Sequence, residues 1–183
     1  MSGFVSLQGS LLVASPALLD PNFRRTVVLL TEHDAEAARG VVLNRRLEIA
    51  VVDAVPVLAG LVEDGAQVFE GGPVQAGSVL ALADFHEPSQ SASIAFGSVG
   101  YLRGDEDPAG LLGDVTAVRV FAGYSGWGPG QLEAELEQEA WITLPAVADD
   151  VFGDPDGLWN RALARKGGRY KLVARMPDDP SLN

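Results

Sequence analysis

The sequence contains no cysteine among its 183 residues. Disulfide bonds, zinc–thiolate sites, iron–sulfur clusters and thiol nucleophiles are therefore excluded, because each of them needs a cysteine sulfur. The chain also has no run of about 18 uncharged apolar residues, and residues 1–8 lack the basic and apolar regions of a signal peptide. We expect a cytoplasmic protein that does not cross a membrane.

Positive charge is scarce in this chain. Thirteen Lys and Arg residues stand against 25 Asp and Glu residues, which gives a net charge of −12. A field of this sign repels polyanions unless a local basic face overrides it. The sequence also shows no helix-turn-helix pattern, basic stripe or zinc module. We therefore expect no direct binding to nucleic acid.

The composition is otherwise that of an ordinary globular protein. Apolar residues make up 47% of the chain and charged residues 21%, unlike the composition of a disordered protein. A chain of this length fits one hydrophobic core. We expect a single domain over residues 1–183, in which residues 177–183 form a disordered acidic tail.

Short apolar and β-branched runs predict most of the strands. Residues 26–31 predict a central strand covered on both faces, paired in an antiparallel hairpin with residues 40–44. The strongest strand signal in the second half is the alternating segment 114–124. Further short strands are expected at residues 11–14, 78–83, 92–96, 99–102, 140–144 and 170–174.

Few segments have helical periodicity. The clearest helices are residues 131–139, preceded by Pro129 and Gly130, and residues 156–166, closed by two glycines. Residues 49–62 are apolar but divided by Pro56, which predicts a short helix or two helical turns before Gly60. Strands that arrive in runs beside few helices indicate an α+β fold with a mixed sheet.

The most specific motif is GYSGWGPGQ at residues 123–131. We interpret it as a strand-to-helix turn in which Gly126 and Gly128 hold unusual backbone angles or close contacts. Tyr124 and Trp127 place two amphipathic rings beside the helix start, where free N–H groups can bind an anion. The favoured interpretation is architectural, with the rings filling the core.

This motif occurs together with the segments 9–12, 20–26, 40–45 and 70–74 and with His33, and the combination resembles the AlgH/YqgE family. The resemblance covers residues 9 to about 144. It implies a single domain with a mixed sheet bent into a partly barrel-like shape and flanked by helices. The family is bacterial and cytoplasmic, is often labelled a transcriptional regulator, and has no established chemistry.

The chain departs from the family pattern at three positions. Arg46 stands where the family usually has proline, Ser125 where it usually has alanine, and Glu139 where the helix commonly ends in Gly or Asn. Because alanine serves at position 125, we do not expect Ser125 to be a nucleophile, and no His is placed beside it by the sequence. We expect no cofactor and no metal, and interpret Asp84, His86 and Glu87 as a solvated turn.

Arginines flank two of the predicted strands. Arg24, Arg25, Arg45 and Arg46 can converge if those strands are neighbours. The ordinary explanation is pairing with a carboxylate such as Glu70 or Glu133, and the alternative is an anion pocket. The acidic residues 133, 135, 137 and 139 of the helix serve solubility or form a face for a basic partner protein.

Two functional hypotheses follow. The first, implied by the resemblance, is a regulatory or protein-interaction role without catalysis; the second is a small-ligand or enzymatic pocket near the 123–131 motif. The oligomeric state, the partner and the ligand stay open. The pocket hypothesis requires side chains to converge on one concave site. The candidate site residues are Arg25, His33, Asn44, Arg45, Glu70, Tyr124, Trp127 and Glu133.

Overall fold

A computed structural model describes residues 3–177. The strands are β1 (Ser10–Ala14), β2 (Val27–His33), β3 (Ala38–Val42), β4 (Arg46–Ala50), β5 (Gln67–Glu70), β6 (Val74–Phe85), β7 (Ser93–Phe96), β8 (Val99–Tyr101), β9 (Val115–Trp127) and β10 (Trp141–Pro145). The helices are α1 (Val51–Ala54), α2 (Gln131–Glu137), α3 (Ala148–Phe152), α4 (Leu158–Lys166) and α5 (Tyr170–Val173). Short 3-10 turns are η1 (Pro56–Leu61), η2 (Pro88–Gln90) and η3 (Pro108–Leu111).

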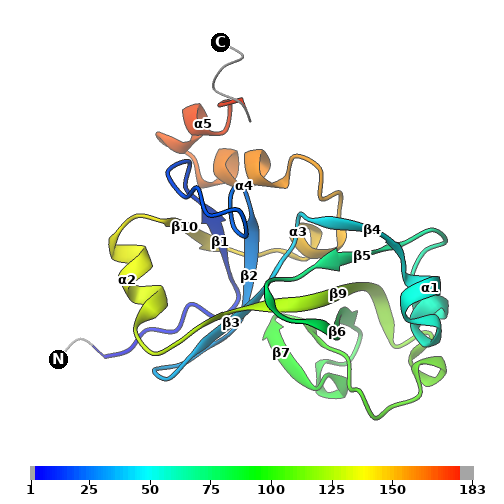
Figure 1. Cartoon of the computed structure of the whole chain (residues 1–183). Helices are drawn as coiled ribbons and strands as arrows, with labels where there is room; N and C mark the ends of the chain where they lie inside the picture. The colour runs from blue at the N-terminus through cyan, green and yellow to red at the C-terminus, as the bar shows by residue number, and fades with distance from the viewer. Residues whose placement is uncertain (1–2, 178–183) are drawn as a thin grey trace.

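The strands form one curled sheet in the order β10-β1-β2-β3-β9-β6-β8-β7. Strand β5 pairs with β9 in parallel, and β4 pairs with the other edge of β5. Every pair other than β5–β9 is antiparallel. Gln8 Nε2, just before β1, donates to Ile94 O at 2.8 Å and so joins the segment before β1 to the edge strand β7. The expected α+β fold with a mixed, partly barrel-like sheet is confirmed (Figure 1).

The central strand β2 is covered on both faces, as expected. Val27 and Leu29 point into the curled interior, where they meet Phe121 and Trp159. Val28 and Leu30 belong to a second cluster with Trp127 and Trp141, beside α2. Alternate side chains of β2 thus pack in two separate hydrophobic clusters, because successive residues of a strand point to opposite faces of the sheet.

A third cluster lies at the end of the molecule that carries α1 (Figure 1). It joins Val51 and Leu58 to Val68 and Val120. The segment 49–62 enters as the end of β4 and then forms two helical turns, α1 and η1, with Pro56 as the first residue of the second. Of the two alternatives predicted, two helical turns divided at this proline is confirmed, but the second turn includes Gly60 and does not end before it.

The last predicted strand differs from the structure. Residues 170–174 were expected as a strand, but residues 170–173 form helix α5, which packs on α4. Gly167 and Gly168 both have positive φ and turn the chain back onto α4. Away from a sheet edge, the segment satisfies the hydrogen bonds of its main chain by forming a short helix.

The expected tail at 177–183 lies outside the described residues except for Pro177. No helix in residues 3–177 is long and apolar enough to cross a membrane.

Strand β9 also continues beyond the predicted segment 114–124. It runs to Trp127 because residues 125–127 pair with β3, in the register Ala38↔Trp127 and Gly40↔Ser125. The turn before α2 is therefore confined to residues 128–130. All of the GYSGW sequence is strand, so the interpretation of the whole motif as a strand-to-helix turn is wrong.

Candidate functional site

The two glycine-rich motifs of the sequence cross each other. Gly71 N–H donates to Ala122 O at 2.8 Å, and a β-carbon on Gly71 or Gly72 would collide with the backbone of residues 123–125. Gly123 has a φ of +70°, and a β-carbon there would collide with Gly72 O. Glycine is required at this crossing both for conformation and for space.

Ser125 lies inside the crossing. Its side chain is fully buried, and its hydroxyl donates to Gly71 O at 3.1 Å. Neither Gly126 nor Gly128 has positive φ, and a β-carbon on Gly128 meets no atom within 4 Å. The expectation that these two glycines hold unusual backbone angles is wrong; Gly123 and Gly130 hold them instead.

His33, the last residue of β2, fastens the N-terminal segment to α2. The exposed fraction of its side chain is 3%. Nδ1 accepts from Leu7 N–H at 2.9 Å, so the hydrogen of the neutral ring is on Nε2, which donates to Glu133 Oε1 at 2.9 Å. The Glu133 main-chain N–H, followed by the His33 imidazole, lowers the pKa of the Glu133 carboxyl from its ordinary value.

An aromatic cluster lies between α2 and the sheet. Trp127 stacks on Phe23 at 6.2 Å between ring centroids and meets Trp141 edge to face at 6.1 Å. One oxygen of Glu135, Oε2, accepts from both indole N–H groups, at 2.9 Å from Trp127 and 2.8 Å from Trp141. Trp127 is therefore a core residue with a satisfied polar end.

Three of the four strand-flanking arginines line one pocket of about 580 Å³. We call it the arginine pocket, and its lining residues are Leu19, Pro21, Arg24, Arg25, Asn44 and Arg45. The guanidinium of Arg45 donates to Asn22 O at 2.6 Å and to Pro21 O at 2.8 Å. Most of the predicted convergence of arginines therefore occurs.

Arg25 is held from several sides. Its guanidinium lies 4.1 Å above the Trp159 ring and donates to Met176 O at 3.1 Å and Pro177 O at 2.6 Å. Asn44 Nδ2 donates to Arg25 O at 2.9 Å. These contacts fix the geometry of the pocket and connect it to the last described residues of the chain.

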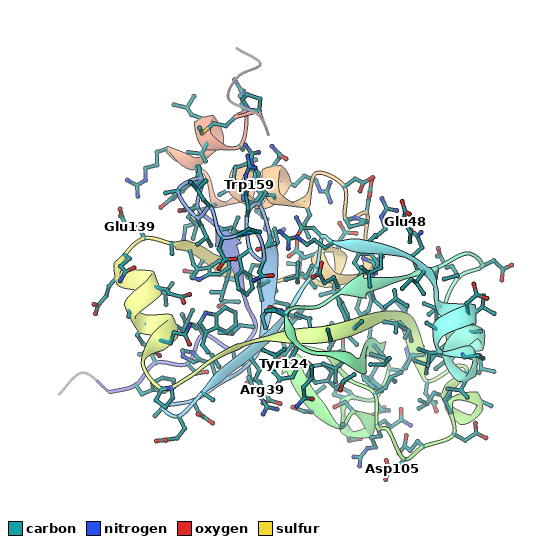
Figure 2. The ribbon with its side chains drawn as sticks, viewed as in Figure 1. Arg39, Glu48, Asp105, Tyr124, Glu139 and Trp159 are labelled. Atoms are coloured by element: carbon teal, nitrogen blue, oxygen red, sulfur yellow. The ribbon has the colours of Figure 1, made fainter. Side chains whose placement is uncertain are left out.

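The remaining predicted site residues lie elsewhere. Arg46 leaves the arginine pocket and pairs with Asp156 at 2.7 Å. Tyr124 lies under the guanidinium of Arg39, 5.3 Å from the ring centroid (Figure 2). Within residues 3–177, Glu70 and Glu133 form no ion pair with an arginine. The ordinary explanation by arginine–carboxylate pairs thus holds for Arg46, but with Asp156.

The candidate residues do not share one pocket. Arg25, Asn44 and Arg45 line the arginine pocket, whereas His33, Trp127 and Glu133 lie around α2. The structure thus divides them into two groups, with Glu70 and Tyr124 in neither. In the described part of the chain, no group of three His, Asp or Glu side chains is placed to hold a metal ion.

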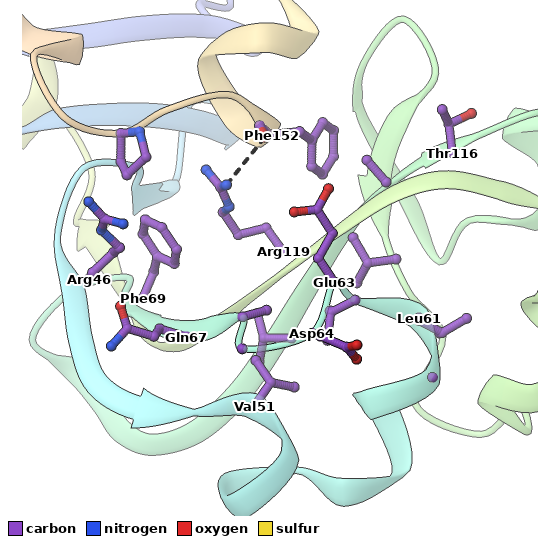
Figure 3. A pocket seen from close by; sticks show the side chains of 18 residues that line it. Arg46, Val51, Leu61, Glu63, Asp64, Gln67, Phe69, Thr116, Arg119 and Phe152 are labelled. Carbon is purple, nitrogen blue, oxygen red and sulfur yellow. Dashed lines mark hydrogen bonds between the residues drawn. The ribbon is translucent and has the colours of Figure 1, made fainter.

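A second cavity, of about 500 Å³, escaped the sequence analysis (Figure 3). It lies between the 46–67 segment, β9 and the turn after α3, and Arg119 lines it. The available signal was that Arg119 is the only charged residue in Val115–Trp127. A single arginine in a core strand indicates a guanidinium that must find partners inside the fold.

Comparison with known proteins assigns the family. The model of the AlgH-like family matches residues 11–171. A UPF0301 protein of Streptomyces coelicolor is 44% identical over 100% of both chains, and one of Chlorobium limicola is 38% identical over 96% of this chain and 95% of the relative. Both similarities extend over nearly the whole length of the chain.

Two solved structures have the same fold. A crystal structure of a Corynebacterium diphtheriae protein has a TM-score of 0.86 and 27% identity, covering 96% of this chain and 95% of that one. The solution structure of the AlgH protein from Pseudomonas aeruginosa, a UPF0301 protein, has a TM-score of 0.71 and 28% identity, covering 98% of each chain. The chain therefore belongs to the AlgH-like family of bacterial proteins.

Proposed function

We propose that this chain acts in the bacterial cytoplasm as a regulatory protein that binds another protein and catalyses no reaction. The observation that carries the proposal is that the groups best suited to nucleophilic catalysis are used internally. Both nitrogens of His33 are hydrogen-bonded, to Leu7 and Glu133, and the Ser125 hydroxyl is buried against Gly71 O. A nucleophile needs an adjacent base and access to substrate, and Ser125 has neither within the described residues.

The surface best suited to a protein partner is at the α1 end of the molecule. Ile49, Val52 and Val57 are 47%, 56% and 69% exposed there, and α1, which carries Val52, contacts both β4 and η1, which carry the other two. The exposed acidic residues Glu48 (Figure 2) and Asp53 are their neighbours in the sequence. We call these five residues the apolar–acidic surface.

This surface fits a partner with an apolar centre and a Lys- or Arg-rich rim. Exposed apolar side chains gathered on one face mark interaction sites, and the neighbouring carboxylates select the complementary charge. The net charge of −12 favours encounter with a basic partner in the same way.

Affinity capture from a lysate of the source cells tests the proposal. We expect a basic protein to be retained by the parent chain and lost from the double variant Val52→Lys/Val57→Lys. The matched control is Val5→Lys/Leu172→Lys, which adds the same charge at two exposed apolar positions elsewhere, 75% and 72% exposed. The control should retain the partner.

Two kinds of result would contradict the proposal. One is a binding result: equal retention of the basic protein by both double variants, or its retention by neither the parent nor the control. The other is turnover of a substrate, or labelling by a serine-hydrolase probe, that Ser125→Ala abolishes while the chain stays folded. A mobility-shift titration of duplex DNA with this chain at low salt tests the alternative of a regulator that binds DNA directly. Saturation below about micromolar, tighter than ordinary non-specific binding, would support that alternative.

A further inference from the structure

The cavity beside Arg119 has the size and composition of a small-molecule site. Its volume of about 500 Å³ lies within the roughly 300–1,000 Å³ range of ligand pockets. Val51, Phe69 and Phe152 supply apolar surface, and charged side chains project from several elements around it (Figure 3).

Arg119 is immobilised in this cavity. Its guanidinium lies 4.5 Å from the centroid of the Phe69 ring. Nη1 donates to Val151 O at 2.7 Å and to Gly153 O at 3.0 Å, and Nη2 donates to Phe152 O at 3.2 Å. Three main-chain carbonyls at the end of α3 therefore hold the cation in a fixed orientation before any ligand arrives.

Among residues 3–177, no acceptor engages the Nε–H or the second Nη2–H of Arg119. A guanidinium has five N–H groups, and three of them are engaged here. The remaining Nε–H and second Nη2–H point the same way, as the fork that binds a carboxylate with two parallel hydrogen bonds. Arg119 thus presents a preformed carboxylate-binding edge.

The charge of Arg119 has no close counterion in the described residues. No carboxylate oxygen among residues 3–177 lies within 4.0 Å of its guanidinium. Burial, followed by the like charge of Arg46, lowers the pKa of Arg119, and the more distant carboxylates of Glu63 and Asp154 offset part of this effect; a guanidinium stays protonated in proteins. A partly buried cation with no carboxylate in direct contact is costly, and an anion bound in contact with it lowers that cost.

We propose that the cavity beside Arg119 binds a small organic monocarboxylate, with the carboxylate on the Nε–Nη2 edge and the apolar body against Phe69 and Val51. A dianion such as a phosphate monoester is disfavoured, because Glu63 and Asp64 also line the cavity and their repulsion costs a dianion about twice as much as a monoanion. The site is independent of the apolar–acidic surface, since none of the five residues of that surface lines the cavity.

Titration with benzoate tests this inference, followed by NMR of the Arg119 Nε–H and of the backbone amides of residues 60–67. We expect saturable shifts with benzoate and much weaker binding of benzamide, its uncharged counterpart, and of phenyl phosphate. Arg119→Lys should weaken benzoate at least tenfold, because lysine cannot offer the two parallel donors. Arg103→Gln, which removes an exposed positive charge outside the cavity, should leave the affinity unchanged.

A second variant blocks the cavity without touching Arg119. Gly60 lines the cavity, its φ lies outside the positive region, and a β-carbon there meets no atom within 4 Å. Gly60→Leu should therefore fold and also weaken benzoate at least tenfold, which decides the matter if Arg119→Lys does not fold. The inference is overturned if benzoate does not saturate, if benzamide or phenyl phosphate binds as well as benzoate, or if Gly60→Leu and Arg103→Gln bind it equally.

Discussion

Asn44 holds the backbone of Arg25 in a conformation that residues other than glycine rarely adopt. Arg25 has a φ of +57°, and Asn44 Nδ2 donates to its carbonyl oxygen at 2.9 Å. At the other end of the same amide, Oδ1 accepts from Val27 N–H at 2.9 Å. The side chain thus takes the place of a peptide group between β2 and the segment after β3. Its two hydrogen bonds hold the strained backbone conformation of Arg25 in the wall of the arginine pocket.

Replacement of Asn44 should therefore destabilise the fold. Asn44→Leu leaves Val27 N–H and Arg25 O without these partners, and Asn44→Asp places a carboxylate oxygen against Arg25 O. Each should lower the free energy of unfolding by about 1–3 kcal/mol, measured by urea denaturation. Asn22→Ala is the control, because Asn22 is exposed and should change stability by less than about 0.5 kcal/mol. A comparable loss in all three variants would show that the amide of Asn44 has no special role.

The glycine crossing predicts opposite signs at two positions of one motif. Gly123→Ala forces an L side chain to a φ of +70° and into Gly72 O, so it should destabilise by more than about 2 kcal/mol. Gly128→Ala meets open space at an ordinary φ and should stabilise by about 0.4–1 kcal/mol, because it restricts the unfolded chain. Urea midpoints that move in the same direction would contradict the crossing.

Glu139 lies just after α2, and its φ is +57°. Glu139 N–H donates to Leu136 O and Ala140 N–H to Glu135 O, the hydrogen bonds of a helix end that favours glycine at this position. Glu139→Gly should therefore raise the free energy of unfolding, by up to about 1 kcal/mol. The same change at Glu137, inside the helix, should lower it by a similar amount. A loss of stability in Glu139→Gly would show that its long contact with Arg169, at 3.7 Å, outweighs the strain.

Much of the fold can be predicted from the sequence because its strands are short apolar runs that need no knowledge of their partners. Segment 26–31 fits this description, and its coverage on both faces follows from its continuous apolar character. The α5 segment does not: four residues with mixed character form a strand or a helix according to what lies beside them. Here Gly167 and Gly168 direct the chain onto α4, a tertiary effect that local propensity cannot report.

The candidate site is less predictable because its contacts join distant parts of the chain. The crossing of Gly71 with Ser125 spans 54 positions, and the bond between His33 and Glu133 spans 100. The sequence marks each residue as unusual but does not say which residues face each other. Glu135 looks like one of several solvated acids on α2, although it is the acceptor for two buried indoles.

The Glu133 carboxylate makes part of the stability depend on pH. Its own main-chain N–H, followed by the His33 imidazole, lowers the pKa of Glu133 in the folded chain, so folding favours the charged form. The contribution is present above the ordinary carboxyl pKa of 4.5 and is lost as the pH falls through the lowered folded value. The difference in unfolding free energy between the parent and Glu133→Gln should thus be larger at pH 7 than in acid.

Glu137→Gln is the matched control for this pH dependence, since Glu137 is an exposed residue of the same helix. Its difference from the parent should change less between the two conditions. A Glu133→Gln difference that stays constant from pH 7 into acid would mean that the main-chain N–H and His33 do not stabilise the charged carboxylate.

The final prediction concerns the single Glu135 oxygen that accepts from Trp127 and Trp141. Glu135→Met keeps the volume of the side chain but leaves two nearly buried indole N–H groups without an acceptor, so it should destabilise the parent chain by about 2–4 kcal/mol. In the background Trp127→Phe/Trp141→Phe, no N–H is orphaned, and the same substitution should cost about 2 kcal/mol less, a coupling typical of groups in one network. Glu137→Met controls for the loss of a helical carboxylate and should cost the same in both backgrounds. If Glu135→Met also costs the same in both, the carboxylate stabilises α2 by other contacts, and the two indoles are held by packing alone.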